Sequence, residues 1–332
     1  MIIENPYLLF LGDAADQLSA KTAHGIADWR HDWCLGQLRM EGCKADIGLP
    51  DMTVEAAVAA GARTLVVGVV NAGGIISERW IEILESALIA GLNVAAGLHN
   101  RLVDVPRLAA AASRHGRHLF DVRHQTRTFG VGNGRKRTGK RLLTVGTDCS
   151  VGKKYTALAI EKEMRERGMN VDYRATGQTG ILIAGDGVSI DAVVADFISG
   201  AAEWLSPDNA PDHWDVVEGQ GSLFHAAFSG VSLGLLHGTQ PDAIVLCHEP
   251  ARSHMRGLPG YALPDLGTCI GANLAAARLT NPAVVCAGVS VNTSRLTPAE
   301  ARNLLLRIED TLDLPAVNTF QDGAGPIVDH LR

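Results

Sequence analysis

A glycine-rich segment near the middle of the chain has the residue types and the spacing of a phosphate-binding loop. It reads Gly146-Thr-Asp-Cys-Ser-Val-Gly-Lys-Lys154, with an apolar run before it and a helical pattern after it. In such a loop the backbone N–H groups point inward, the N-terminus of the next helix adds positive potential, and a lysine supplies a point charge. We predict that this loop binds the phosphates of a nucleotide or of a nucleotide-containing cofactor. The predicted contacts are Gly146, Thr147, Asp148, Cys149, Ser150, Val151, Gly152, Lys153, Lys154 and Tyr155.

Two departures from the common loop argue against phosphoryl transfer. Five residues separate Gly146 from Gly152, one more than usual, and this spacing resembles the dethiobiotin-synthetase-like branch of P-loop proteins. Lys154 stands where a hydroxyl side chain normally ligates Mg²⁺, which a charged lysine cannot do. A second cation can instead neutralise a diphosphate, so we predict a site without a metal ion. Cys149 is either a nucleophile, with a thiol pKa lowered by the helix terminus, or a small side chain that lets the loop close.

Three residues are candidates for acid–base chemistry. Glu218 ends an apolar strand and precedes Gly-Gln-Gly, at the end of a strand where sites form in parallel sheets. It is our first choice for a general base, although it could instead bind backbone amides of the glycine turn. His225 follows that turn and is either a proton carrier or a buried histidine with satisfied hydrogen bonds. Asp191 is the third candidate.

Two further segments that follow predicted strands could contact a substrate. The segment 176–180 has two glycines and short polar side chains, which favours a ligand-facing loop with contacts from Thr176, Gln178 and Thr179. The segment 248–261 is rich in histidine and arginine, and an arginine fork binds a carboxylate through two hydrogen bonds. We predict that it binds an acidic small molecule, although it could be a solvated loop with incidental charge. The arginines assigned to the substrate are Arg252 and Arg256, with Arg174 as the next candidate.

We expect two α/β domains to position these segments. A chain of 332 residues has an ordinary length for a protein of two domains. Strands alternate with helices throughout, which predicts parallel sheets. We predict a Rossmann-like domain over 1–134, a linker at 135–138 and a P-loop domain over 139–332. The expected strands are 7–11, 64–70, 92–96, 119–122, 142–145, 171–176, 214–218, 243–247, 283–289 and 315–317. The expected helices are 77–90, 106–115, 155–167 and 297–312, the last with a capping box that begins at Thr297.

The amino-acid composition indicates which kinds of binding partner this chain is expected to lack. The net charge is −6 and the one basic cluster, at 135–141, is short, which favours a linker over a nucleic-acid surface. We find no signal peptide and no apolar stretch long enough to span a bilayer. The six cysteines form no C-x-x-C pair and no zinc spacing, and they fit a reducing, cytoplasmic setting. We expect a homodimer that binds neither nucleic acid nor membranes.

Taken together, several motifs resemble one two-domain family, that of the D-glutamate N-acetyltransferases. They are the loop at 146–153, the segments 176–180 and 217–222, and, in the N-terminal part, Gly97-Leu-His99 and Asn71-Ala-Gly-Gly74. The resemblance covers essentially the whole chain. It implies a Rossmann-like domain followed by a P-loop domain, acetyl-CoA as the donor and D-glutamate as the acceptor. Coenzyme A carries a pyrophosphate and a 3′-phosphate, which suits a metal-free loop with Lys153 and Lys154.

We therefore expect an enzyme that moves the acetyl group of acetyl-CoA to the amine of D-glutamate or a similar acidic D-amino acid. The amine must lose a proton before it attacks the thioester, and a carboxylate or a histidine near the loop would accept that proton. Two alternatives stay open at this point. One is an ATP- and Mg²⁺-dependent ligase or kinase of the dethiobiotin-synthetase type, and the other is a nucleotide-binding regulatory module without catalysis.

Overall fold

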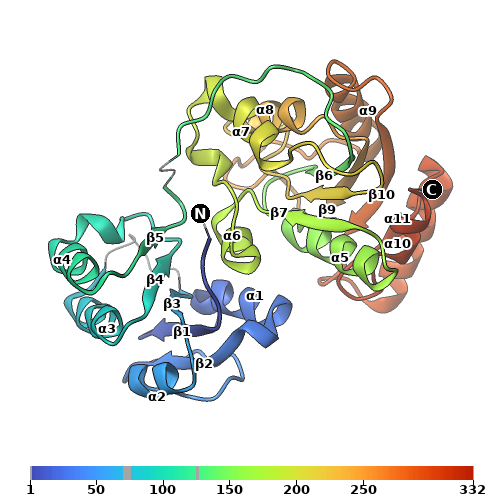
Figure 1. Cartoon of the computed structure of the whole chain (residues 1–332). Helices are drawn as coiled ribbons and strands as arrows, with labels where there is room; N and C mark the ends of the chain where they lie inside the picture. Colours follow the sequence, from blue (N-terminus) through green and yellow to red (C-terminus); the bar gives the residue numbers. More distant parts are fainter. Residues whose placement is uncertain (1, 70–75, 125–126, 332) are drawn as a thin grey trace. The chain divides into compact units, whose positions relative to one another are not determined.

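The structure is a computed structural model that describes residues 2–69, 76–124 and 127–331 (Figure 1). Contacts divide the chain into two compact units. The N-terminal unit consists of 1–126 together with 177–192, and the C-terminal unit consists of 127–176 together with 193–332. The short segment 177–192 therefore groups with the N-terminal unit, although it follows a strand of the C-terminal unit.

The N-terminal unit is built on a parallel sheet with strand order β2-β1-β3-β4-β5. Helices α3 and α4 pack against each other on one side of this sheet, and α1 packs with α6 on the other (Figure 1). The strands are β1 (Tyr7–Gly12), β2 (Cys34–Arg39), β3 (Thr64–Val67), β4 (Asn93–Ala96) and β5 (Leu119–Asp121). The helices are α1 (Lys21–Trp29), α2 (Val54–Ala59), α3 (Glu78–Ile89), α4 (Pro106–His115) and α6 (Gln178–Ala184).

The C-terminal unit has a second parallel sheet, with strand order β11-β10-β9-β6-β8-β7. Helices α7, α8 and α9 lie on one face of it, and α5, α10 and α11 lie on the other (Figure 1). The strands are β6 (Lys140–Gly146), β7 (Val171–Arg174), β8 (Trp214–Val217), β9 (Ala243–His248), β10 (Val285–Val291) and β11 (Ala316–Val317). The helices are α5 (Lys153–Glu166), α7 (Ile198–Leu205), α8 (Ser229–Thr239), α9 (Leu266–Ala277), α10 (Pro298–Leu312) and α11 (Gly325–Asp329).

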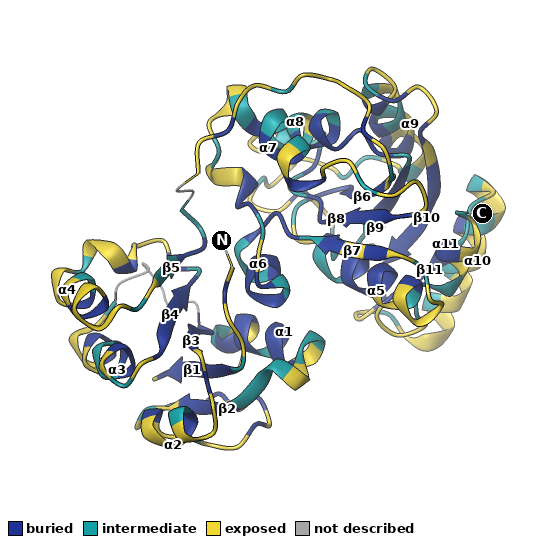
Figure 2. Ribbon diagram, viewed as in Figure 1, coloured by how far each residue is buried: buried dark blue, intermediate teal, exposed yellow. Residues whose placement is uncertain are grey.

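The central strands are apolar because helices cover both faces of each sheet. The strands β1, β3 and β4 are buried along their whole length, and so is β6 after Lys140 (Figure 2). Such strands read as continuous apolar runs rather than as alternating ones, which made them visible in the sequence. The next strands in the chain, β7 and β8, lie on one side of β6, whereas β9 pairs with its other side. The strand order therefore reverses at β6. Ligands bind at the carboxyl ends of strands at such points.

The predicted elements are confirmed to within a few residues, and the structure adds several that the sequence analysis did not include. The added elements are β2, α1, α2, α6, α7, α8, α9 and α11. The capping box of α10 is present, with Thr297 and Glu300 bonded reciprocally. The turn Asn71-Ala-Gly-Gly74 lies outside the described residues. Among the described helices, none has the length and apolar character needed to cross a bilayer.

The basic cluster that we predicted to be a linker belongs to the C-terminal unit and packs within it. Arg135 pairs with Asp208, and Lys136 pairs with Asp242 at 2.7 Å. The Arg137 side chain is buried and donates to the carbonyl oxygens of Gly238 and Thr239, where α8 ends. Each of these three residues therefore has a partner within the C-terminal unit.

Candidate functional site

The predicted phosphate loop connects β6 to α5, as the sequence indicated. Its tight course depends on Gly146, where a Cβ would lie 2.8 Å from Val151 and 3.0 Å from the Lys153 ammonium. Gly152 (φ +105°) and Ser150 (φ +54°) both have left-handed backbone conformations. The left-handed conformation is sterically unfavourable for a serine, because it has a Cβ. Such strain is typical of functional loops that are held in place by the surrounding structure.

Lys153 is the first residue of α5, and its side chain turns back into the phosphate loop. Its ammonium is buried and donates to the backbone carbonyl oxygen of Asp148 at 2.8 Å. Burial holds the pKa of Lys153 below its usual value. The turn after β8 packs on the stem of this side chain, because Gly219 has no Cβ, and a Cβ there would lie 1.6 Å from the Thr144 carbonyl oxygen and 3.1 Å from Lys153 Cδ. The lysine is therefore positioned at the centre of the site.

Arg252 clamps the loop to the segment after β9. Its Nη1 donates to the Asp148 carboxylate and to the Cys149 carbonyl oxygen, both at 2.6 Å, and its Nη2 donates to the Ser150 carbonyl oxygen at 2.7 Å. Its Nε donates to the Glu249 carboxylate at 2.7 Å. These contacts use the guanidinium that we had assigned to a substrate carboxylate. In this structure Arg252 instead holds the shape of the phosphate loop.

Asp148 is the buried carboxylate that pairs with Arg252. Its side chain is 0% exposed and accepts hydrogen bonds from Arg252, from the Arg256 backbone N–H at 2.8 Å and from the Cys149 backbone N–H at 2.6 Å. Burial alone would raise the pKa of this carboxyl, but the three donors outweigh it and hold the pKa below its usual value. Asp148 is thus an ionised structural group.

Arg256 differs from Arg252 in exposure. Its backbone is bound to Asp148, while its side chain is exposed and contacts the Ser150 hydroxyl. The guanidinium therefore stands at the rim of the loop with solvent access. Of the two arginines, Arg256 has the geometry expected of a residue that binds an incoming anion.

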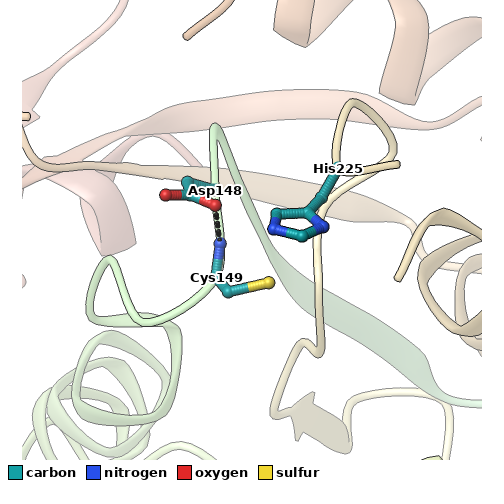
Figure 3. Close-up of side chains that lie close together, drawn as sticks. All are labelled: Asp148, Cys149 and His225. Carbon is teal, nitrogen blue, oxygen red and sulfur yellow. Dashed lines mark hydrogen bonds between the residues drawn. The ribbon is translucent and has the colours of Figure 1, made fainter. Parts of the chain in front are cut away.

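Cys149 and His225 face each other at the loop (Figure 3). The Cys149 Sγ, a carboxylate oxygen of Asp148 and a ring nitrogen of His225 all lie within 4.8 Å of one another. Cys149 is half-buried, and His225 is 2% exposed. Burial raises the pKa of the Cys149 thiol above its usual value, more than the nearby Lys153 charge lowers it, so the lowered value we expected is wrong.

Two hydrogen bonds fix the orientation of the His225 ring. Its Nδ1 accepts from the Ala227 backbone N–H at 3.2 Å, and its Nε2 lies 3.0 Å from the Arg256 carbonyl oxygen. A neutral ring with its hydrogen on Nε2 satisfies both bonds. The ring also stacks on Phe228 with centroids 4.6 Å apart. His225 therefore links the turn after β8 to the arginine segment after β9.

Glu218 braces the ends of β7 and β8. Its carboxylate accepts from the Tyr173 hydroxyl and from the Thr176 backbone N–H, each at 3.0 Å. Its carbonyl oxygen accepts from the Thr176 hydroxyl at 2.5 Å. Glu218 is 4% exposed, and its carboxylate has a structural role, although its partners are Tyr173 and Thr176 and not the amides of the glycine turn that we expected. Gln220 adds to the brace by donating to the Thr176 hydroxyl at 3.1 Å.

The segment 176–180 is not the open loop that we predicted. Gly177 is the N-cap of α6, so Gln178 and Thr179 lie in the first turn of a helix that packs in the N-terminal unit. A Cβ on Gly97 would lie 3.1 Å from Gln178, and the Thr179 hydroxyl lies 3.5 Å from that of Thr22. Gly177 therefore begins a helix rather than an open loop, and the ligand contacts of Thr176, Gln178 and Thr179 stay a prediction.

Three other predicted residues have protein partners. Asp191 belongs to the N-terminal unit, where it lies 3.6 Å from Arg123 and accepts from the Ser189 hydroxyl. Arg174 bonds to Asp215 at 2.6 Å and to Asp172 at 3.0 Å, on the edge of the second sheet. The Lys154 ammonium lies 4.2 Å from the centre of the Tyr155 ring. Of these, only Lys154 stands at the phosphate loop.

Two residues of this site were missed by the sequence analysis. Glu249 is buried and bonds Arg252, three positions later in the chain. His248 ends β9, and its Nδ1 lies 3.1 Å from the Thr147 hydroxyl. The acid–arginine spacing at 249 and 252 is the signal that could have indicated an internal ion pair. Burial lowers the pKa of His248, which favours the neutral ring.

Two clusters of the described residues have the side chains of a metal site. They are Asp148, Cys149 and His225, and Asp172, His213 and Asp215. In each cluster an arginine already pairs with a carboxylate, Arg252 with Asp148 and Arg174 with Asp215. A cation would have to displace these guanidinium groups, so the donor sets fit ion pairs better than a metal.

The two parallel sheets and the loop define a P-loop protein with a Rossmann-like N-terminal unit. The chain belongs to the DUF1611 family, because the family's P-loop domain of unknown function (DUF1611_C) matches residues 128–328. The Rossmann-like domain of unknown function of the same family (DUF1611_N) matches residues 38–125. The predicted fold class is thereby confirmed.

Known relatives span the whole chain. The chain is 55% identical over 330 residues to a protein named D-glutamate N-acetyltransferase from Tritonibacter scottomollicae, with 99% of each chain covered. It is 51% identical over 331 residues to a protein of the same name from Pseudoalteromonas, with 100% of each covered. A crystal structure of a DUF1611 family protein from Anabaena variabilis matches with a TM-score of 0.83 and 28% identity, and 99% of each chain is covered. The family resemblance seen in the motifs is confirmed.

Proposed function

We propose that this chain is an N-acetyltransferase that transfers an acetyl group to the amine of D-glutamate. The observation that carries the proposal is the identity of 55% and 51%, over essentially the full length, to two proteins of that name. The test is to incubate the purified protein with acetyl-CoA and a panel of D- and L-amino acids, and to measure N-acetylated product. We expect D-glutamate to be the preferred acceptor, and absence of product with every acidic amino acid would contradict the proposal.

Acetyl-CoA is our proposed donor, bound through its phosphates at the loop that precedes α5. The loop supplies backbone N–H groups, the N-terminus of α5 and the buried Lys153, which together suit a diphosphate. Lys154 adds a second cation at the same helix start. Arg256 is our candidate for an acceptor carboxylate, because its guanidinium is exposed at the rim of the loop. The predicted homodimer, the cytoplasmic location and the absence of nucleic-acid partners stay predictions.

Removal of divalent metal is expected to leave acetyl-CoA binding unchanged. Lys154 occupies the position of the usual Mg²⁺-ligating hydroxyl, and its charge repels a cation. Isothermal titration calorimetry of acetyl-CoA with and without EDTA measures this directly. A large affinity loss on chelation would contradict the metal-free site, and tighter binding of ATP with Mg²⁺ than of acetyl-CoA would favour the ligase or kinase alternative.

Loss of the Lys153 charge is expected to weaken acetyl-CoA binding about ten- to a hundredfold. A charge-assisted hydrogen bond is worth roughly 1.5–3 kcal/mol, and each 1.4 kcal/mol is about a factor of ten in affinity. The variant to use is Lys153→Met, because it keeps most of the buried volume and removes the ammonium group with its bond to the Asp148 carbonyl oxygen. Calorimetry gives the affinity, and Lys162→Met, on the exposed face of α5, is the matched control. Equal affinity in Lys153→Met and the wild type would place the phosphates elsewhere.

A further inference from the structure

Cys149 is the cysteine of this protein that is placed for chemistry. All six cysteines are described, and Cys247, Cys269 and Cys286 are buried. Cys34 and Cys43 are half-buried but belong to the N-terminal unit. Cys149 is half-buried, lies in the phosphate loop, and points toward the imidazole of His225 (Figure 3). It therefore combines solvent access, a neighbouring base and the proposed donor site.

We propose that Cys149 receives the acetyl group from the donor and then passes it to the acceptor amine, so that the transfer proceeds by double displacement. The inference rests on the proposed function, and it identifies how the same site performs the transfer. A thiol beside a histidine is one of the recurring arrangements of covalent catalysis. The alternative is direct attack of the amine on the acetyl thioester, in which Cys149 has no covalent part.

Each half of the reaction balances without a further reactant. In the first half the Cys149 sulfur bonds to the acetyl carbonyl carbon, the carbon–sulfur bond to coenzyme A breaks, and the thiol proton ends on the coenzyme A sulfur. In the second half the acceptor nitrogen bonds to the same carbon, the bond to Cys149 breaks, and a proton of the amine returns to the Cys149 sulfur. A thioester is replaced by a thioester and then by an amide, so no oxidation or reduction takes place.

His225 is the group that carries these protons. Burial raises the pKa of Cys149, so the thiol is neutral near pH 7 and needs a base as its sulfur attacks. To act, the ring must exchange one of its two backbone hydrogen bonds, to Ala227 N–H or to the Arg256 carbonyl oxygen, for one to the thiol. The Nδ1 bond of 3.2 Å is the longer of the two. The Cys149 sulfur and the His225 ring nitrogen lie within 4.8 Å of each other, which can exceed a hydrogen-bond distance. Catalytic hydrogen bonds are often long before a substrate binds and shorten in the complex.

The first experiment looks for the acetyl-enzyme. Wild-type protein is mixed with acetyl-CoA alone, quenched in acid and examined by mass spectrometry, and exchange of labelled coenzyme A into acetyl-CoA is measured without any amino acid. We expect one acetyl group on the peptide that contains Cys149, and exchange at a rate at least equal to the overall reaction. No acetylation and no exchange, while N-acetyl-D-glutamate still forms when the acceptor is added, would overturn the inference and leave the proposed function intact. No product in that last step would instead count against the proposed function.

The second experiment uses single-residue variants to test whether Cys149 is the nucleophile. Cys149→Ala is expected to lower kcat at least about 10³-fold and to abolish exchange, because loss of a nucleophile removes the whole covalent route. Its acetyl-CoA affinity, measured by calorimetry, should stay near the wild-type value and so show that the loop is intact. Cys43→Ala is the matched control, since Cys43 is equally half-buried, and it should behave as wild type. A Cys149→Ala variant that keeps its kcat would overturn the inference.

His225→Gln separates proton transfer from positioning. The glutamine amide can still accept from Ala227 N–H and donate to the Arg256 carbonyl oxygen, so the two backbone contacts survive. We expect the exchange reaction to slow about 10²- to 10⁴-fold, the usual contribution of general acid–base catalysis. Exchange at the wild-type rate would show that another group carries the protons.

Discussion

Replacement of Arg252 by alanine is expected to lower the free energy of unfolding by about 3–5 kcal/mol, the usual cost of removing one partner from a buried ion pair. Arg252 neutralises two buried carboxylates, those of Asp148 and Glu249. It also donates to two carbonyl oxygens of the phosphate loop. Chemical denaturation followed by tryptophan fluorescence measures the loss, and acetyl-CoA binding should weaken in parallel because the loop loses its clamp.

Arg256→Ala is the matched control for this prediction. The Arg256 side chain is exposed, and its backbone N–H, which bonds Asp148, is retained in the variant. An exposed contact of this kind is worth about 0–1 kcal/mol, so stability should change little, while the KM for the amino acid should rise. Equal stability losses in the two variants would contradict the clamp. A raised amino-acid KM in Arg252→Lys at unchanged stability would return Arg252 to substrate binding, as the sequence first indicated.

The same clamp predicts a pH dependence. The folded-state pKa of Asp148 is held below its usual value, which is about 3.9, so its contribution to stability is present at neutral pH and is lost as the pH falls through the folded-state pKa. In Arg252→Ala the burial remains while one of three donors is gone. The pKa of Asp148 should then rise toward its unfolded-state value, so the stability that this carboxyl loses on acidification should be smaller than in the wild type. Unfolding free energies measured at a series of acid pH values test this shift.

Glu218→Ala is expected to lower the free energy of unfolding by roughly 2–4 kcal/mol. The substitution removes the buried acceptor of both the Tyr173 hydroxyl and the Thr176 N–H, and each such loss costs about 1–3 kcal/mol. Glu218→Gln should be much milder, because both donors bond the same carboxylate oxygen and the glutamine amide oxygen can accept from both. Thermal melting and steady-state kinetics of both variants give the comparison.

The glutamine variant also tests the catalytic alternative. If Glu218 were the general base, Glu218→Gln would lower kcat about 10²- to 10⁴-fold with unchanged melting and unchanged acetyl-CoA affinity. We expect instead that Glu218→Gln keeps most of its kcat, and that Glu218→Ala loses stability and acetyl-CoA affinity together. A selective loss of kcat in the glutamine variant would restore the base assignment.

The sequence predicted well those features that depend on neighbouring residues. Buried parallel strands show as short apolar runs, and the loop at 146–153 shows by its glycines and lysine. The capping box at Thr297 is likewise a local pattern, and it is present in the structure. The spacing of residues along one segment determines each of these features, so one sequence is enough to find them.

Features that depend on contacts between distant segments could not be predicted in the same way. Arg252 and Asp148 are 104 positions apart, and no local pattern tells whether an arginine pairs with a substrate or with a buried aspartate. The thiol pKa of Cys149 was misjudged for the same reason, because burial comes from segments elsewhere in the chain. The sequence likewise identified Thr176-Gly-Gln-Thr-Gly180 as a glycine-containing polar loop but contained no local sign that a helix begins there.

The helix α6 has a consequence for any attempt to divide this protein. The chain passes between its two units three times, at residues 126–127, 176–177 and 192–193. A fragment that ends before the phosphate loop would lack α6, and α1 would lose the helix packed beside it, including the contact of Thr22 with Thr179. A fragment that begins there would carry the apolar residues Ile181 and Leu182 into solvent. The two units are therefore inseparable by a single cut, and a gene fusion or a recombination event can exchange neither of them as one contiguous piece.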